Sequence, residues 1–111
     1  MRGKWPVSVF LVAVVYLLTG LVGFVHHFGE ISAPDGIGIE LTEFLAFVAG
    51  VFLLLGRSWA RWLAVGWIAF HVVLSIWNSW SQVAVHAVVC ALIAWALFRP
   101  RASQYFRRAT V

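Results

Sequence analysis

The sequence predicts an all-α integral membrane protein, folded as an up-down-up-down four-helix bundle. Hydrophobic residues make up 63% of the 111 positions and charged residues 11%, whereas a soluble domain carries about 25% charged residues. The apolar residues form long blocks rather than periodic stripes. The later connections between these blocks are short, and short connections make consecutive helices antiparallel neighbours.

One transmembrane domain is expected over residues 1–111, with four spans. The first is almost purely apolar from Val7 to Val25, long enough at about 1.5 Å per residue to cross a hydrocarbon core of about 30 Å. This apolar run is too long for a signal peptide, so we expect an uncleaved helix. The last span ends at Arg99-Pro100, because proline cannot continue a helix. The expected spans are residues 6–28, 37–55, 59–80 and 81–98.

The charged residues predict the orientation. Eight basic residues lie at the N-terminus, in the second connection and in the tail 99–111: Arg2, Lys4, Arg57, Arg61, Arg99, Arg101, Arg107 and Arg108. Four acidic residues lie around the first connection: Glu30, Asp35, Glu40 and Glu43. Retention of basic residues in the cytoplasm predicts that both termini lie there, in a bacterial cytoplasmic (inner) membrane. Anchoring beside anionic lipid accounts for the basic residues, so no nucleic-acid partner is expected.

Polar residues inside the spans mark the candidate site, because each needs a reason to be in lipid. In the third span, His71 and Asn78 share one helix face, and His86 opens the fourth. Glu43 opens the second span, and His26 and His27 close the first. If these residues face inward, they converge below the outer surface. The expected cofactor-binding residues are His71, His86, Glu43 and Asn78, and the expected metal ligands are His26, His27, Glu43, His71 and His86.

A structural role is the competing interpretation of the same residues. The helix dipole favours a carboxylate such as Glu43 in a first turn without any ligand. His86 can satisfy helix packing by pairing with Glu43 or Asn78. No His-x-x-x-His spacing occurs within one predicted helix. We therefore prefer structural pairing to a ligand site as the interpretation of these residues.

The stretch EFLAFVAGVFLLLGR from Glu43 to Arg57, followed by ARWLA at 60–64, resembles the DoxX-like group of small bacterial four-span proteins. In that group a glutamate opens the second helix, and a leucine run ends in a glycine and a basic turn. The group's usual glycine-rich end of the fourth helix is replaced here by Phe98-Arg99-Pro100. The resemblance implies a compact four-helix bundle, an association with membrane oxidoreductases and quinone chemistry, and Glu43 as the residue of interest.

Three functions fit these features. The first is a non-catalytic, DoxX-like accessory subunit of a redox-type membrane complex, whose partners are the lipid bilayer and either other membrane subunits or further copies of itself. The second is binding of a transition metal, a haem or a quinone headgroup by the outer histidines and glutamates, because imidazole and carboxylate suit such ligands. The third is a transporter or channel, which needs oligomers because the 111 residues contain no internal repeat.

Overall fold

The computed structural model describes residues 5–30, 32, 34 and 36–110, and these contain helices and connections but no strand. This confirms the all-α class. Arg2, Lys4 and Asp35, which enter the charge argument, lie outside the described residues. The elements are α1 (Val7–His27), the 3₁₀ turn η1 (Phe28–Glu30), α2 (Gly36–Leu54), α3 (Trp59–Ser75), α4 (Trp80–Phe98) and α5 (Pro100–Thr110).

Three of these helices, α1, α2 and α4, are long and apolar enough to cross a membrane. They match three of the four predicted spans. Helix α3 has 17 residues, a length of about 25 Å, and it ends at Ser75 where the sequence predicted helix to residue 80. The chain then turns, and α4 begins where the Ser79 hydroxyl accepts a hydrogen bond from the backbone nitrogen of Gln82 at 3.2 Å. A membrane crossing by α3 stays a prediction.

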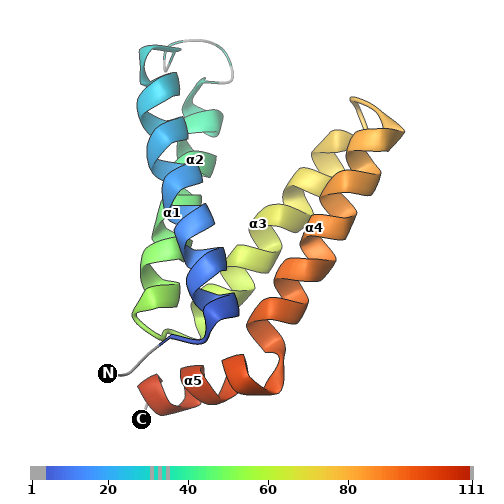
Figure 1. Ribbon diagram of the computed structural model, residues 1–111. Coiled ribbons are helices and arrows are strands. Elements are labelled where there is room, and N and C mark those ends of the chain that lie inside the picture. Colours follow the sequence, from blue (N-terminus) through green and yellow to red (C-terminus); the bar gives the residue numbers. More distant parts are fainter. Residues whose placement is uncertain (1–4, 31, 33, 35, 111) are drawn as a thin grey trace.

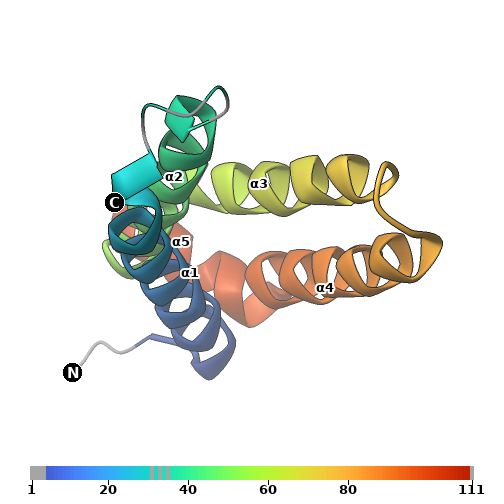
Figure 2. The same cartoon turned by 90° about the horizontal axis from the view of Figure 1, so that it is seen from above.

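The four long helices form two antiparallel hairpins, α1–α2 and α3–α4, which diverge from a common end (Figure 1). Seen from above, α3 and α4 run away from α1 and α2 (Figure 2). Two hydrogen bonds join α3 to the first hairpin: Tyr16 donates to the carbonyl of Ala64 at 2.6 Å, and the Trp67 indole donates to the carbonyl of Thr42 at 2.8 Å. The helices alternate in direction, but the closed four-helix bundle is not confirmed.

Helices α1 and α2 pack closely because small residues lie at their contact. A side chain at Gly20 would bring its Cβ to 2.6 Å from the carbonyl oxygen of Glu43, and one at Gly50 to 2.8 Å from that of Ala13. Small residues let membrane helices approach each other in this way. Gly66 of α3 is not at such a contact, since a Cβ there would meet nothing within 4 Å among the described residues.

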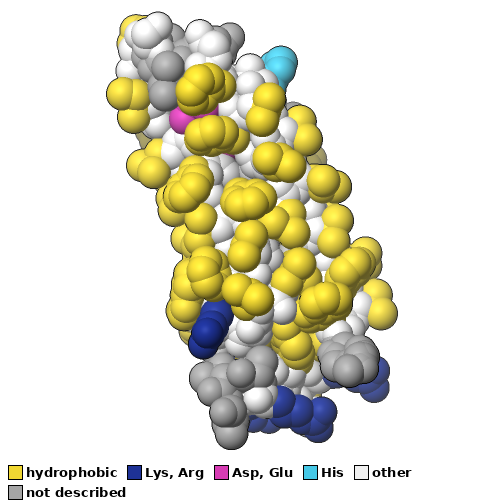
Figure 3. Space-filling model, turned by 90° about the vertical axis from the view of Figure 1, so that its left-hand side faces the viewer, with side chains coloured by type: hydrophobic (Ala, Val, Ile, Leu, Met, Phe, Trp, Pro, Cys, Tyr) yellow, Lys and Arg dark blue, Asp and Glu magenta, His cyan; other side chains and the backbone are white. Residues whose placement is uncertain are grey.

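Both hairpins meet at the end of the molecule that we name the arginine end, after Arg57, Arg61, Arg99, Arg101, Arg107 and Arg108. Helix α2 stops there because Gly56 adopts a positive φ of 79°. The nitrogens of Gly56 and Arg57 bond back to the carbonyls of Leu53 and Phe52 at 3.1 and 3.0 Å, which is the Schellman arrangement. In Figure 3, Lys and Arg side chains gather at this end, acidic and histidine side chains lie towards the opposite end, and hydrophobic ones cover the face between.

The basic tail 99–111 contains helix α5, which lies across the arginine end (Figure 1). Pro100 does not continue α4 but begins this new helix, as proline does at a first helical position. Ala102 and Phe106 are fully buried against the rest of the protein. The Tyr105 hydroxyl donates to the carbonyl of Leu54 at 2.8 Å, and burial raises the pKa of this phenol, which keeps its proton in place. The tail is therefore part of the fold.

Arg61 differs from the lipid anchor that the sequence predicted. Its guanidinium lies between two rings, 4.5 Å from the centroid of Phe98 and 4.8 Å from that of Phe106. It also donates to the hydroxyl of Ser103 at 3.3 Å. Arg61 therefore joins α3 to the end of α4 and to α5, and it holds the arginine end together.

Candidate functional site

The candidate site lies at the end of the molecule opposite the arginine end, where α2 faces α1. Glu43, half-buried on α2, places its carboxylate against Gly23 of α1, in the space where any other residue would carry its Cβ. Alanine at position 23 would therefore displace this carboxylate. The glycine in α1 and the glutamate in α2 form one complementary pair.

Two histidines surround this pair. His27 and His71 both lie within electrostatic range of the Glu43 carboxylate. His27 Nδ1 is 3.0 Å from the carbonyl oxygen of Gly23, one turn earlier in α1. His71 Nδ1 is 2.9 Å from the carbonyl oxygen of Trp67, and its ring lies over the Trp67 ring with centroids 4.0 Å apart. The site therefore takes side chains from α1, α2 and α3.

These hydrogen bonds decide which ring nitrogen is available to a ligand. A carbonyl oxygen only accepts, so Nδ1 of His27 and of His71 carries the proton and donates it. In the neutral imidazole this leaves Nε2 as the nitrogen that accepts a hydrogen bond or binds a metal. Backbone carbonyls hold metal-ligating histidines in the same way, although the bond also serves a histidine that binds nothing.

Glu40 is the residue whose importance the sequence did not show. Glu40 is only 4% exposed and lies within electrostatic range of Glu43. Among the residues that the structure describes, neither of its carboxylate oxygens has a hydrogen-bond partner. A buried polar group without a partner is unfavourable. In sequence terms Glu40 and Glu43 are equivalent acidic residues in the opening turns of a helix, so only the packing distinguishes them.

The remaining predicted residues are not part of this group. His26 borders it: this histidine is exposed, and its ring meets that of His27 edge-on with centroids 4.9 Å apart. His86 lies on α4, with Nδ1 2.8 Å from the carbonyl oxygen of Gln82, and Asn78 is exposed in the turn before α4. Among the described residues, no three His, Cys, Asp or Glu side chains are placed to hold a metal ion together. The five-ligand metal site stays a prediction, and the geometry supplies no ready set of three ligands for it.

Comparison with family models, curated proteins and solved structures finds no match to this chain. The DoxX-like resemblance therefore stays a prediction from the residues between Glu43 and Ala64. Function has to be argued from the chain's own geometry.

Proposed function

We propose that this protein is a non-catalytic subunit of a larger assembly in the bacterial cytoplasmic membrane, with both termini in the cytoplasm. The supporting observation is the divergence of the hairpins in Figure 1. Only 11% of the apolar stretch of α4 is buried within the protein, although this helix is long enough to span a membrane. A helix that makes so few contacts within its own chain has room for contacts with another.

The exposed surface of the second hairpin is compatible with a partner helix. Trp77 and Trp80, at its tip, are 77% and 76% exposed, and Val85 on α4 is 60% exposed. Tryptophan suits the membrane interface by itself, so the proposal rests on how little of the apolar stretch of α4 is buried within the protein. The partner we propose is a different membrane subunit, which contacts α4 around Val85, towards the tip of the second hairpin.

Photocrosslinking from α4 tests this proposal. A photoreactive side chain in place of Val85 should join the protein to one distinct membrane chain in intact cells, because the partner covers α4 there. Purification in a mild detergent should bring down the same chain at a fixed ratio, measured by mass spectrometry. A single monodisperse chain, or crosslinks to copies of itself alone, would contradict the proposal.

A second candidate function is the binding of a redox ligand's polar head by Glu40, Glu43, His27 and His71. The observation in its favour is the unpartnered Glu40 beside a carboxylate that two histidines approach. A quinol headgroup fits this chemistry, since its hydroxyls donate hydrogen bonds to carboxylate oxygens and to Nε2 of a neutral histidine. A metal or haem iron is the other possible occupant, with Nε2 of His71 as the first ligand.

Two substitutions, His71→Ala and Glu43→Gln, test this site. In gently purified protein we expect each to lower the content of extracted quinone or of bound metal or haem at least tenfold. The measurements are elemental analysis, the absorption spectrum and chromatography of the extracted quinone. His26→Ala, at the exposed neighbouring histidine, should change none of them. Equal contents in all four proteins would remove the binding function and leave structural pairing as the role of these residues.

A further inference from the structure

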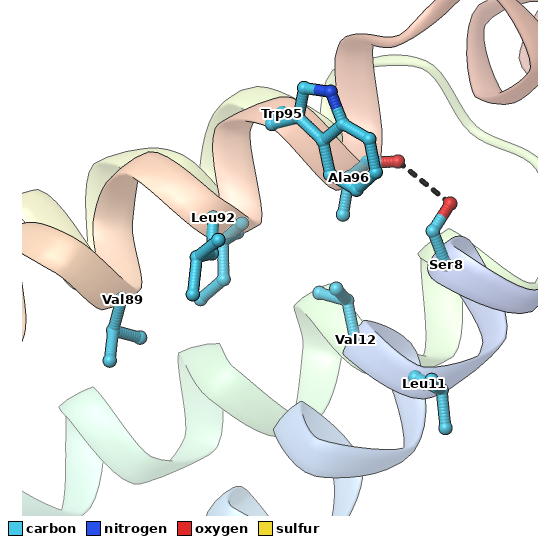
Figure 4. A pocket seen from close by; sticks show the side chains of 8 residues that line it. Ser8, Leu11, Val12, Val89, Leu92, Trp95 and Ala96 are labelled. Carbon is cyan, nitrogen blue, oxygen red and sulfur yellow. Dashed lines mark hydrogen bonds between the residues drawn. The ribbon is translucent and has the colours of Figure 1, made fainter.

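A groove lies between the two hairpins on the side of the arginine end, and the functions proposed above do not use it. It has a volume of about 280 Å³ and is lined by residues from the start of α1 and the second half of α4. Val12 from α1 and Val89 and Leu92 from α4 point into it (Figure 4), and its lining is almost wholly apolar. At one end the Ser8 hydroxyl donates to the carbonyl of Ala96 at 3.0 Å. This hydrogen bond joins α1 to α4 there.

The lining and the length of the groove indicate the kind of occupant that it fits. The α4 residues that line it, from Val89 to Ala96, extend over about 10 Å. A narrow, flexible, apolar chain fits this space, and an acyl chain of a membrane lipid has that shape.

Charge at the end of the groove selects the lipid class. Trp95 lines the groove, and the guanidinium carbon of Arg99 lies 4.7 Å from the centroid of its ring. Helix α5 begins at the next residue, Pro100, so the positive end of its dipole lies beside Arg99. Arginine at the membrane surface attracts anionic lipid headgroups. Along α4, the apolar residues that line the groove are followed by the positive charge of Arg99. A membrane lipid has the same order, an apolar acyl tail followed by a charged headgroup.

We propose that this groove binds one anionic phospholipid from the leaflet at the arginine end. Its acyl chain lies between Val12 and Leu92, and its phosphate lies at Arg99. The lipid fills space between the hairpins and stabilises their angle. This site is independent of the Glu43 group, which lies at the opposite end of the molecule.

Native mass spectrometry of the purified protein, with added phosphatidylglycerol or phosphatidylcholine, tests the proposal. The wild-type protein should retain one phosphatidylglycerol about fivefold more than phosphatidylcholine, which is the ratio expected for one arginine at a membrane surface. Arg99→Gln should abolish this preference. Arg101→Gln, at an exposed arginine of α5, should leave it unchanged.

A matched pair of tryptophan substitutions tests the position of the lipid's acyl chain. Val89→Trp places an indole in the groove and should lower the retained lipid at least fivefold. Val88→Trp makes the same change at the neighbouring residue, which does not line the groove and is 59% exposed, and should retain lipid as the wild type does. Equal lipid retention in the two variants, or equal binding of the two lipids to the wild type, would overturn the proposal. A change in the number of protein chains per complex with Val89→Trp alone would also overturn it. The last result would identify the occupant as a second copy of the protein.

Discussion

Gly20→Ala should destabilise the protein by about 3 kcal/mol, at the upper end of what overpacking costs. The added methyl group would meet the backbone nitrogen of Phe47 and lie 2.6 Å from the carbonyl oxygen of Glu43. Both are backbone atoms, so this steric overlap is relieved only if α1 and α2 move apart. The contact between these helices is the most extensive in the protein, and the Glu43–Gly23 pair depends on it. Thermal unfolding in detergent, followed by circular dichroism, measures the loss.

The same substitution at Gly66 is the control. A Cβ at this position of α3 meets nothing within 4 Å, so Gly66→Ala should leave the unfolding midpoint unchanged or raise it slightly, because alanine is the better helix former. An equal loss of stability in both variants would mean that the close approach of α1 to α2 does not hold the hairpin together.

The sequence predicted α1, α2 and α4 to within one residue at each end because each is a continuous apolar block, whereas α3 ends earlier than predicted and helix α5 was not predicted. Gly56 closes α2 with a positive φ, and Ser79 caps α4. The contact glycines of α1 and α2 could be found for a similar reason, since small residues in a lipid-soluble helix mark a close approach. Spacing alone could not tell Gly20, which packs on backbone, from Gly66, which faces open space.

The angle between the hairpins could not be predicted. In a span that is apolar on every side, the faces turned to lipid and to protein have the same composition, so the pattern gives no direction. The contacts that set the arrangement are single ones, such as Tyr16 to Ala64 and Trp67 to Thr42. For the same reason, the sequence could not predict which residues of the candidate site come together. His27 and His71 each lie within electrostatic range of Glu43 because α1, α2 and α3 are in contact, whereas His86 lies on α4, which diverges from α1 and α2 (Figure 1).

Charge predicted a side of the membrane for Arg61 but could not predict its contacts. Positive-inside reasoning treats every arginine alike, and it placed Arg61 among the lipid anchors. The structure instead places its guanidinium between Phe98 and Phe106, with Nε buried and without a partner. Aromatic residues from α4 and α5 are too distant in the sequence for this contact to be visible before the fold is known.

Replacing Arg61 should therefore release α5. The guanidinium stacks on rings from two helices and donates to Ser103 and to the carbonyl of Leu97, so Arg61→Ala should cost about 3 kcal/mol, within the range for desolvated cation–π contacts and charged hydrogen bonds. Arg61→Lys should recover little of this, because an ammonium group cannot stack between two rings and bridge two acceptors at once. In hydrogen exchange, the α5 amides should exchange roughly a hundredfold faster, the ratio that corresponds to this energy.

Arg57→Ala separates this effect from a loss of positive charge. Arg57 is exposed in the connection before α3, so its removal lowers the charge of the arginine end equally and leaves the contacts of Arg61 with α5 in place. Exchange in α5 should stay as slow as in the wild type. It should also stay slow when salt is raised, because screening acts more strongly on exposed charges than on the partly buried guanidinium of Arg61. Rapid exchange in Arg57→Ala, or full protection in Arg61→Lys, would show that general charge, rather than the planar guanidinium between Phe98 and Phe106, attaches α5 to the two hairpins.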